Sequence, residues 1–218
     1  MKRNVWVVIA AHNEAARIGK VLDSAKKYVD KIVVVDDGSA DHTFEVAEKN
    51  AIALRHGVNL GKGAALKTGC DYAVKHGADI IVVLDADGQH DPREIPRFLS
   101  ALEGADIVFG YRKLNEKMPF VLRFGNWFIN KVAQVLYGMK MKDTQSGYRA
   151  FRSDTYKKIR WEASDYSMES EMIANVGKSK LRHREIPIET IYGDRYKGTT
   201  IIDGIKIIFS MIWWKIAK

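Results

Sequence analysis

The segment from Ile80 to Asp91 constrains this chain more than any other. Five apolar residues, 80–84, are followed within seven positions by three carboxylates, Asp85, Asp87 and Asp91. An uninterrupted apolar run of this length is typical of a strand buried on both faces of a parallel sheet. Ligand sites in such sheets open at the carboxyl ends of the strands. Because close carboxylates repel each other, we expect a hard divalent cation there, itself holding a diphosphate.

Short apolar runs alternate with segments of helical periodicity through the first half of the chain. Ile18, Val21 and Leu22 recur at the spacing of one helix face, and Asp91 before Pro92 is typical of a capped helix start. The pattern predicts strands at 5–10, 32–35, 52–54, 80–84 and 107–109, and helices at 18–29, 41–50 (capped by Ser39) and 64–75. We therefore expect an α/β fold with a mostly parallel central sheet and helices on both faces.

The second half of the chain is less regular. Its pattern predicts helices at 120–137 and 168–176, a polar loop at 144–149 and a late strand at 185–191. No repeat, low-complexity tract or linker separates the halves. We expect a single domain of two halves, followed by a C-terminal amphipathic helix.

Composition excludes several classes of protein. Hydrophobic residues make up 46% of the 218 residues and the net charge is +8, which fits a globular chain with an anionic partner. The basic residues form no compact block and no platform with aromatic residues, so no nucleic acid is expected. The single cysteine, Cys70, excludes an intrachain disulfide and favours a reducing compartment. The apolar stretch 5–11 is too short for a signal-peptide core, and no run of about 20 apolar residues predicts a spanning helix.

Polar or glycine-rich segments follow the early strands. Asn13-Glu14 follows the first strand, Asp36-Asp37-Gly38-Ser39 follows the second, and 59–63 precedes the third helix. Each has a structural alternative, as a helix cap, a turn or a plain loop. The functional alternative is that Asp36 or Asp37 holds a ribose hydroxyl or base edge, while 59–63 presents N–H groups and a lysine to a phosphate or sugar.

Asp85, Asp87 and Gln89 place three oxygen ligands within five residues. Mg²⁺ and Mn²⁺ prefer oxygen ligands, so this spacing predicts a metal site and leaves the neighbouring His90 a structural role. The alternative is a solvated turn before the helix cap at Asp91.

Five motifs in this order resemble those of family 2 glycosyltransferases, and most closely the dolichyl- and polyprenyl-phosphate hexosyltransferases. The motifs lie at 9–14, 35–39, 59–63, 85–90 (Asp-Ala-Asp-Gly-Gln-His) and 143–148 (Asp-Thr-Gln-Ser-Gly-Tyr). The resemblance covers residues 5–200. It implies a GT-A fold, a nucleotide-sugar donor and Mg²⁺ or Mn²⁺, in a domain of residues 1–200 whose nucleotide-sugar half is 1–112 and whose acceptor half is 113–200.

The resemblance also implies roles for individual residues. It assigns the metal to Asp85, Asp87 and Gln89. Residues implied to bind the nucleotide sugar are Ala10, Ala11, His12, Asn13, Glu14, Asp37, Gly61, Lys62, Asp85 and Ala86. Residues implied to contact the acceptor or a phosphate are Arg112, Arg123, Ser146, Arg195 and Lys197. The candidate catalytic residues are Asp87, Arg112, Arg123 and Glu169.

Two positions depart from the family pattern. His12 stands where a tyrosine is usual, so the imidazole would have to replace the phenol ring against the base. Lys197 stands where an arginine is common, which keeps the charge but loses bidentate geometry.

The implied reaction moves a hexose from a nucleotide diphosphate to a lipid phosphate with inversion at the anomeric carbon. A phosphate nucleophile is largely ionised at neutral pH and needs no strong base, whereas a hydroxyl acceptor needs one. Glu169 and Glu171 are the candidate bases, and a solvated helix start is their structural alternative. The loop at 143–148 favours UDP-glucose over GDP-mannose. Two alternative functions remain. One is a glycosyltransferase that acts on a soluble or glycan hydroxyl acceptor, and the other is a regulatory protein that binds nucleotide sugars without turnover.

Residues 201–218 combine a wide apolar face, paired tryptophans and terminal lysines. This composition is typical of a helix lying on a membrane surface. The segment is too short and too charged to span a membrane. The alternative is packing on the sheet or on another subunit. We expect a peripheral protein on the cytoplasmic face of a membrane, with a membrane partner subunit or a homo-oligomer as further partners.

Overall fold

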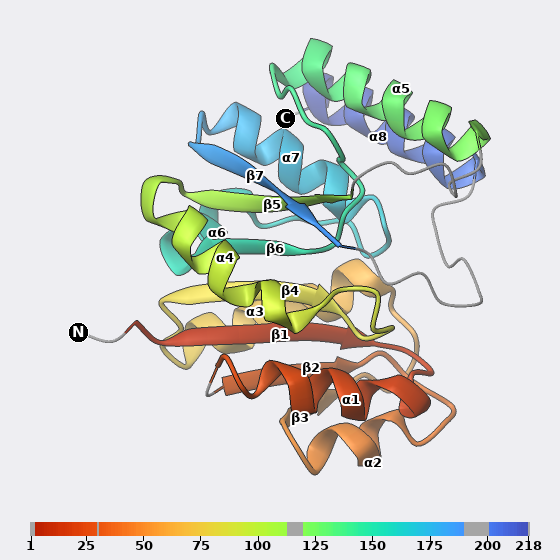
Figure 1. The fold of residues 1–218 in the computed structure, drawn as a ribbon. Coiled ribbons are helices and arrows are strands. Elements are labelled where there is room, and N and C mark those ends of the chain that lie inside the picture. The colour runs from red at the N-terminus through yellow and green to blue at the C-terminus, as the bar shows by residue number, and fades with distance from the viewer. Residues whose placement is uncertain (1–2, 30, 113–119, 190–200, 218) are drawn as a thin grey trace.

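Seven strands form one sheet in the computed structural model, which describes residues 3–29, 31–112, 120–189 and 201–217 (Figure 1). The strands lie in the order β3-β2-β1-β4-β6-β5-β7. Their bounds are β1 Val5–Ala11, β2 Lys31–Asp36, β3 Ile52–Arg55, β4 Ile80–Asp85, β5 Ile107–Arg112, β6 Arg149–Arg152 and β7 His183–Ile188. Only β6 among them runs antiparallel to its neighbours. The predicted α/β fold with a mostly parallel sheet is confirmed.

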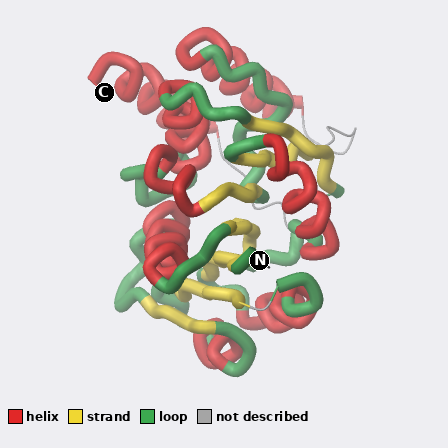
Figure 2. Tube along the Cα trace, turned by 90° about the vertical axis from the view of Figure 1, so that its left-hand side faces the viewer, coloured by secondary structure: helices red, strands yellow, loops and turns green. Residues whose placement is uncertain are grey.

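Helices cover both faces of this sheet (Figure 2). One face packs against α1 and α4, and the other against α3, α6 and α7. The bounds are α1 Ala15–Ala25, α2 Thr43–Glu48, α3 Lys62–Lys75, α4 Ile95–Ala101, α5 Phe120–Tyr137, α6 Ser153–Ile159, α7 Met168–Lys178 and α8 Ile201–Ala217, with short 3₁₀ turns at Pro92–Glu94 and Leu102–Gly104. Successive side chains of a strand point to opposite faces, so Val7 and Val8 of β1 enter different halves of the core. This explains why the central strands are apolar throughout.

Several sequence predictions of secondary structure were wrong in detail. β6 and α6 were not predicted, and the late strand begins at His183 rather than 185. Ser39 caps no helix; α2 begins at Thr43, and the Ser39 hydroxyl instead accepts a hydrogen bond from the Asn13 N–H. Asp91 does cap its turn by accepting from the Arg93 N–H, but the turn is 3₁₀ and α4 begins afterwards.

The helices α5 and α8 lie side by side, outside α7 (Figure 1). The Tyr137 hydroxyl of α5 donates to the Met211 carbonyl of α8. Ile207 and Met211 of α8 are buried, whereas Phe209 and Trp213 are 70% and 66% exposed. The alternative that this segment packs on protein is therefore correct for one face of the helix, and a second apolar face points outward. Within the described ranges, no helix is long and apolar enough to cross a membrane.

The helix α3 approaches the sheet closely at Gly69. A Cβ added there would lie 2.5 Å from Val8 Cγ1 and 3.2 Å from Val35 Cγ2. We expect Gly69→Ala to overpack this contact and lower the free energy of unfolding by about 1–3 kcal/mol, as measured by urea denaturation. Gly125→Ala in α5 is the control, because nothing lies within 4 Å of its added Cβ. Equal stability of the two variants would contradict the close approach.

Candidate active site

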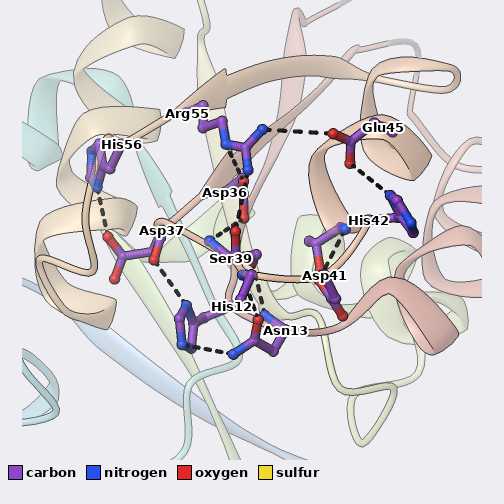
Figure 3. A network of polar contacts seen from close by, with 12 residues as sticks. His12, Asn13, Asp36, Asp37, Ser39, Asp41, His42, Glu45, Arg55 and His56 are labelled. Carbon is purple, nitrogen blue, oxygen red and sulfur yellow. Dashed lines mark hydrogen bonds and ion pairs between the residues drawn. The ribbon is translucent and has the colours of Figure 1, made fainter.

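The first part of the site is a polar network at the carboxyl ends of β1 and β2 (Figure 3). Asn13 adopts a left-handed backbone conformation, with φ 54°. Its side-chain oxygen accepts from the Ala40 N–H at 2.9 Å, and its own N–H donates to Ser39 Oγ at 2.9 Å. These bonds tie the loop after β1 to the loop after β2 and so shape one wall of the site.

His12 lies exposed on this wall with a fixed ring orientation. Its Nδ1 is 2.9 Å from the Asp37 carbonyl oxygen, and its Nε2 is 3.0 Å from the Asn13 side-chain nitrogen. Since a carbonyl can only accept, Nδ1 carries the proton and Nε2 accepts. The ring therefore presents a pre-oriented flat face, as stacking against a base requires.

Asp37 uses both carboxylate oxygens to hold the loop before α3. Oδ1 accepts from His56 Nδ1 at 2.7 Å and from the Leu60 N–H at 3.0 Å, and Oδ2 accepts from the Gly61 N–H at 2.8 Å. Its contact with a donor stays a prediction. What the structure adds is that this carboxylate fixes the segment carrying Lys62.

Asp36 and Arg55 form an ion pair that was not predicted from the sequence. Arg55 Nε lies 3.1 Å from the buried Asp36 Oδ2, and its Nη2 donates to the Ser39 carbonyl at 3.2 Å. Arg55 also lines a cavity of about 390 Å³ with Gly38, Ser39, His56 and Gly57. The Asp36 carboxylate thus binds groups of the turn after β2 and of Arg55.

Lys62 joins the two halves of the chain. Its Nζ lies 2.8 Å from Asp85 Oδ1 at the end of β4 and 3.0 Å from Glu169 Oε1 in α7. Burial alone would raise the pKa of Asp85, but the Lys62 ammonium, helped by the Arg112 guanidinium, holds it at about 2. Burial lowers the pKa of Lys62, and the two carboxylates more than reverse this. A salt-bridged cation is therefore built into the site.

The glycines beside Lys62 permit this placement. Gly61 has φ 98°, and a Cβ there would lie 2.4 Å from the Ser164 carbonyl oxygen. A Cβ at Gly63 would lie 2.4 Å from the Ala163 carbonyl oxygen. The first turn of α3 consequently packs its backbone directly against the loop before α7, which no residue with a side chain could allow.

The carboxylates after β4 fit a divalent cation. Burial and the neighbouring Asp85 charge raise the pKa of Asp87, so a cation there would relieve an unfavourable negative charge. Asp87 Oδ1 accepts from the Gln89 N–H at 2.9 Å, in a turn that Gly88 makes with φ 76°. The oxygen donors of Asp85, Asp87 and Gln89 suit Mg²⁺ or Mn²⁺. No cluster of three or more His, Cys, Asp or Glu ligands exists in the part of the chain that the structure describes.

His90 is buried behind this turn. Its Nδ1 accepts from the Asp85 N–H at 3.1 Å, and its ring packs 5.1 Å from the Tyr148 ring, centroid to centroid. Burial lowers the pKa of His90, which keeps the accepting imidazole neutral. The contacts agree with the structural role expected from the sequence.

Arg112 and Asp143 form a bidentate ion pair. Arg112 Nε and Nη2 lie 2.7 and 3.1 Å from the two Asp143 oxygens. Burial raises the pKa of Asp143, but Arg112 outweighs it, so the net shift is downward. Asp143 also accepts from the Gln145 N–H at 3.0 Å, and it thereby anchors the loop at 144–148 to the end of β5. No role for Asp143 beyond membership of the motif was predicted from the sequence.

Glu169 and Glu171 are buried, so the structural alternative of a solvated helix start was wrong. Glu171 Oε2 accepts from the N–H groups of Glu162 and Ala163, at 3.0 and 2.9 Å, because the preceding loop folds over the helix start. Glu169 Oε2 and Ser146 Oγ are buried and, within the described residues, have no hydrogen-bond partner. Buried polar atoms left unpaired are uncommon, and a bound ligand or an ordered water is one way in which they become satisfied.

The remaining predicted residues are placed as follows. Ala10 and Ala11 end β1, opposite Asp85 and Asp36 respectively, and Ala86 is buried after β4. Glu14 is buried and lies 2.9 Å from Arg17. Arg123 belongs to α5, and Arg195 and Lys197 fall outside the described residues.

Comparison with known proteins identifies this arrangement. Residues 6–160 match the model of Glycosyl transferase family 2. The chain belongs to this family. It is therefore a glycosyltransferase, and the predicted enzyme class is confirmed.

Two curated members of the family and one solved structure are similar over nearly the whole chain. A UDP-N-acetylglucosamine–dolichyl-phosphate N-acetylglucosaminyltransferase of Methanococcus voltae is 32% identical, covering 98% of this chain and 97% of that protein. An undecaprenyl-phosphate mannosyltransferase of Micrococcus luteus is 30% identical, covering 92% and 88%. Glucosyl-3-phosphoglycerate synthase from Mycobacterium tuberculosis, solved with Mn²⁺, UDP and phosphoglyceric acid, superposes with a TM-score of 0.77 at 18% identity, covering 98% and 78%. The fold is thus that of GT-A glycosyltransferases.

The Arg112–Asp143 pair gives this glycosyltransferase a testable pH dependence. A carboxyl group whose pKa is depressed on folding stabilises the fold above its unfolded pKa, and that contribution is lost as the pH falls. Arg112→Met leaves a buried carboxylate without its cation, which we expect to lower the free energy of unfolding at pH 7 by about 3 kcal/mol. The difference from wild type should shrink as the pH falls, because burial protonates Asp143 of the variant above the ordinary carboxyl pKa, whereas Arg112 holds the wild-type group ionised below it.

The measurement is urea denaturation as a function of pH. Arg182→Met is the matched control, since Arg182 is 73% exposed and its partner Asp106 24%, whereas Asp143 is fully buried. A difference for Arg112→Met that stayed constant with pH would contradict the assigned ion pair.

Proposed function

We propose that this chain transfers a hexose from a nucleoside-diphosphate sugar to a polyprenyl or dolichyl phosphate, with inversion at the anomeric carbon. The observation that carries the proposal is the meeting of Asp85, Lys62 and Glu169, which brings the strand-end carboxylates of the first half against the loop and helix of the second. The named relatives with polyprenyl- or dolichyl-phosphate acceptors support it, because they are similar over nearly their whole length.

The donor would lie along the carboxyl ends of β1, β2 and β4. The exposed His12 ring supplies a face for the base, and the start of α3 brings Lys62 toward the donor. A cation held by Asp87, with Asp85 and Gln89, would neutralise the charge that develops on the departing diphosphate. Because Asp85 Oδ1 is paired with Lys62, Asp87 is the carboxylate that this arrangement leaves for the cation. Arg112 adds positive charge at the end of β5.

The acceptor would approach from the second half. A phosphate nucleophile is already ionised, so no side chain has to remove a proton from it. This suits Glu169, whose Oε1 is engaged by Lys62. We assign contacts with the acceptor phosphate to Arg123, Arg195, Lys197 and Ser146, of which only Ser146 has a described side chain.

The outward apolar face of α8 supports a membrane surface as the site of action. Besides Phe209 and Trp213, this face exposes Ile205, Ile212 and Ile216, with Lys206 and Lys215 beside them. Tryptophans with flanking lysines favour the interface of an anionic bilayer. We propose a peripheral position on the cytoplasmic face, where a lipid-linked phosphate reaches the acceptor half.

Transfer to the lipid is tested with labelled nucleotide sugars and polyprenyl phosphate, followed by extraction into organic solvent. UDP-N-acetylglucosamine, UDP-glucose and GDP-mannose form the donor panel, with Mn²⁺ or Mg²⁺ present. Asp87→Ala should lower the rate at least about a hundredfold, because a metal contributes several kcal/mol to leaving-group stabilisation. Asp23→Asn, at an exposed position of α1, should transfer at the wild-type rate.

Two outcomes would count against the proposal. Full transfer by Asp87→Ala would end the metal assignment, and label that stays in the aqueous phase on a soluble or glycan hydroxyl would establish the alternative acceptor.

Membrane binding is tested by flotation with phosphatidylcholine vesicles, with and without phosphatidylglycerol. Replacing Phe209 and Trp213 by serine removes two large apolar side chains from the exposed face, so we expect flotation with the anionic vesicles to fall severalfold. Val58→Ser is the control, because Val58 is also exposed but lies in the loop after β3. Unchanged flotation of the double variant would exclude α8 as the membrane contact.

A further inference from the structure

Arg149 is a buried cation beside the site, and no role was predicted for it from the sequence. It opens β6, where it lies opposite Val83 of β4 and Phe109 of β5. These two strands end in Asp85 and Arg112 respectively. The Arg149 side chain is 1% exposed, and its guanidinium lies 5.1 Å from the centroid of the Phe109 ring. It is therefore placed between the two strands that carry the site and cannot itself reach a ligand.

The guanidinium is held by main-chain carbonyls of two separate segments. Nε donates to the Ser146 carbonyl at 3.1 Å and Nη2 to the Thr144 carbonyl at 3.2 Å, both in the loop before β6. Nη1 donates to the Glu169 carbonyl at 3.0 Å, in the first turn of α7. A planar fork of donors can bridge such segments in one fixed geometry, which a lysine cannot reproduce.

Each of these segments contacts the Lys62 bridge. A Cβ on Gly147, next to Ser146, would lie 2.8 Å from Asp85 Oδ2 and 3.0 Å from Lys62 Nζ, so the loop backbone packs directly on that ion pair. Glu169 supplies the other carboxylate of the bridge, 3.0 Å from Lys62 Nζ. Arg149 thus holds the backbone on both sides of the Lys62 ammonium.

We propose that Arg149 is a positioning residue for the transfer reaction. It fixes the loop at 144–147 and the first turn of α7 relative to each other, and so sets where Lys62 holds Asp85 and Glu169 when donor and acceptor meet. The inference rests on the proposed function, since it concerns the geometry of that transfer. Displacing a site by about 1 Å from a distance can slow a reaction by as much as about a hundredfold, so the loss should appear in kcat more than in nucleotide affinity.

The test compares Arg149→Met, Arg149→Lys and Arg152→Met. Arg152 is the matched control, because it lies in the same strand and also donates to a main-chain carbonyl, that of Leu102 at 3.1 Å, but away from the site. For Arg149→Met we expect kcat per folded molecule to fall at least about tenfold, with the nucleoside-diphosphate dissociation constant within about twofold of wild type. Arg149→Lys should recover part of kcat, and Arg152→Met should keep it all.

A merely structural Arg149 would give a different result. Arg149→Met would then melt at a lower temperature but, corrected for the folded fraction, would keep the wild-type kcat, and this would overturn the proposal. Partial rescue by Arg149→Lys together with normal nucleotide binding supports it.

Gly147→Ala keeps the inference testable if Arg149→Met does not fold. The three atoms nearest to its added Cβ are movable side-chain ends of Asp85 and Lys62, so the fold should survive while kcat falls. Gly19→Ala is the control, with a Cβ at an ordinary 3.5 Å from Val46. Wild-type kcat in Gly147→Ala would overturn the coupling between loop and bridge.

The wild-type enzyme separately tests the proposed function. If it binds nucleoside-diphosphate sugar but transfers to a hydroxyl acceptor rather than to polyprenyl phosphate, the proposed acceptor fails. The comparison of Arg149→Met with Arg152→Met is then made with that acceptor, and its result still decides the role of Arg149.

Discussion

The salt bridge of Lys62 with Asp85 and Glu169 is the interaction on which the site depends. It links an element of each half of the chain, the end of β4 and the start of α7, through one ammonium group that is only 17% exposed in its side chain. A buried ion pair is a poor source of stability, because desolvation offsets much of the Coulomb attraction, but breaking one is costly. The bridge therefore constrains geometry more than it stabilises the fold, which is what a two-substrate site requires.

The rest of the site supports this bridge from several directions. Asp37 holds the loop that leads into Lys62, and the bare backbones of Gly61 and Gly63 let α3 approach the loop before α7. On the other side, Arg149 fixes the backbone around Gly147 and Glu169. None of these residues has to touch a substrate to matter for the proposed transfer, because each sets the position of Lys62, Asp85 or Glu169.

The sequence predicted the parts of this molecule that follow from local pattern. The apolar runs of β1, β2 and β4 and the polar residues at their ends were correctly located, since periodicity and strand-end chemistry are local properties. β6 was missed because it is only four residues long and contains two arginines, one of which is buried by long-range contacts. Glu169 and Glu171 looked like a solvated helix start for the same reason, since the loop that buries them is distant from the pattern of the helix itself.

The ion-pair partners of individual charged side chains could not be predicted from the sequence either. Asp143 stood inside a recognised motif, yet its role as the anchor of Arg112 depends on β5 and the following loop meeting in space. Lys62 was expected to face the donor, and only the fold shows that two carboxylates already engage it. Charges at the ends of strands can be counted from a sequence, but which of them neutralise one another is decided by topology.

The way those charges are neutralised supports the proposed phosphate acceptor. Glu169 has one oxygen engaged by Lys62 and the other buried without a hydrogen-bond partner among the described residues. A general base must lie within hydrogen-bond reach of the proton that it removes and must be free to accept it. An oxygen engaged by an ammonium is poorly suited to that task, whereas a phosphate acceptor arrives ionised and makes it unnecessary. Under the proposed transfer the demand then falls on the leaving diphosphate, and a cation held by Asp87, with Lys62 at the start of α3 and Arg112 at the end of β5, would supply the positive charge near it.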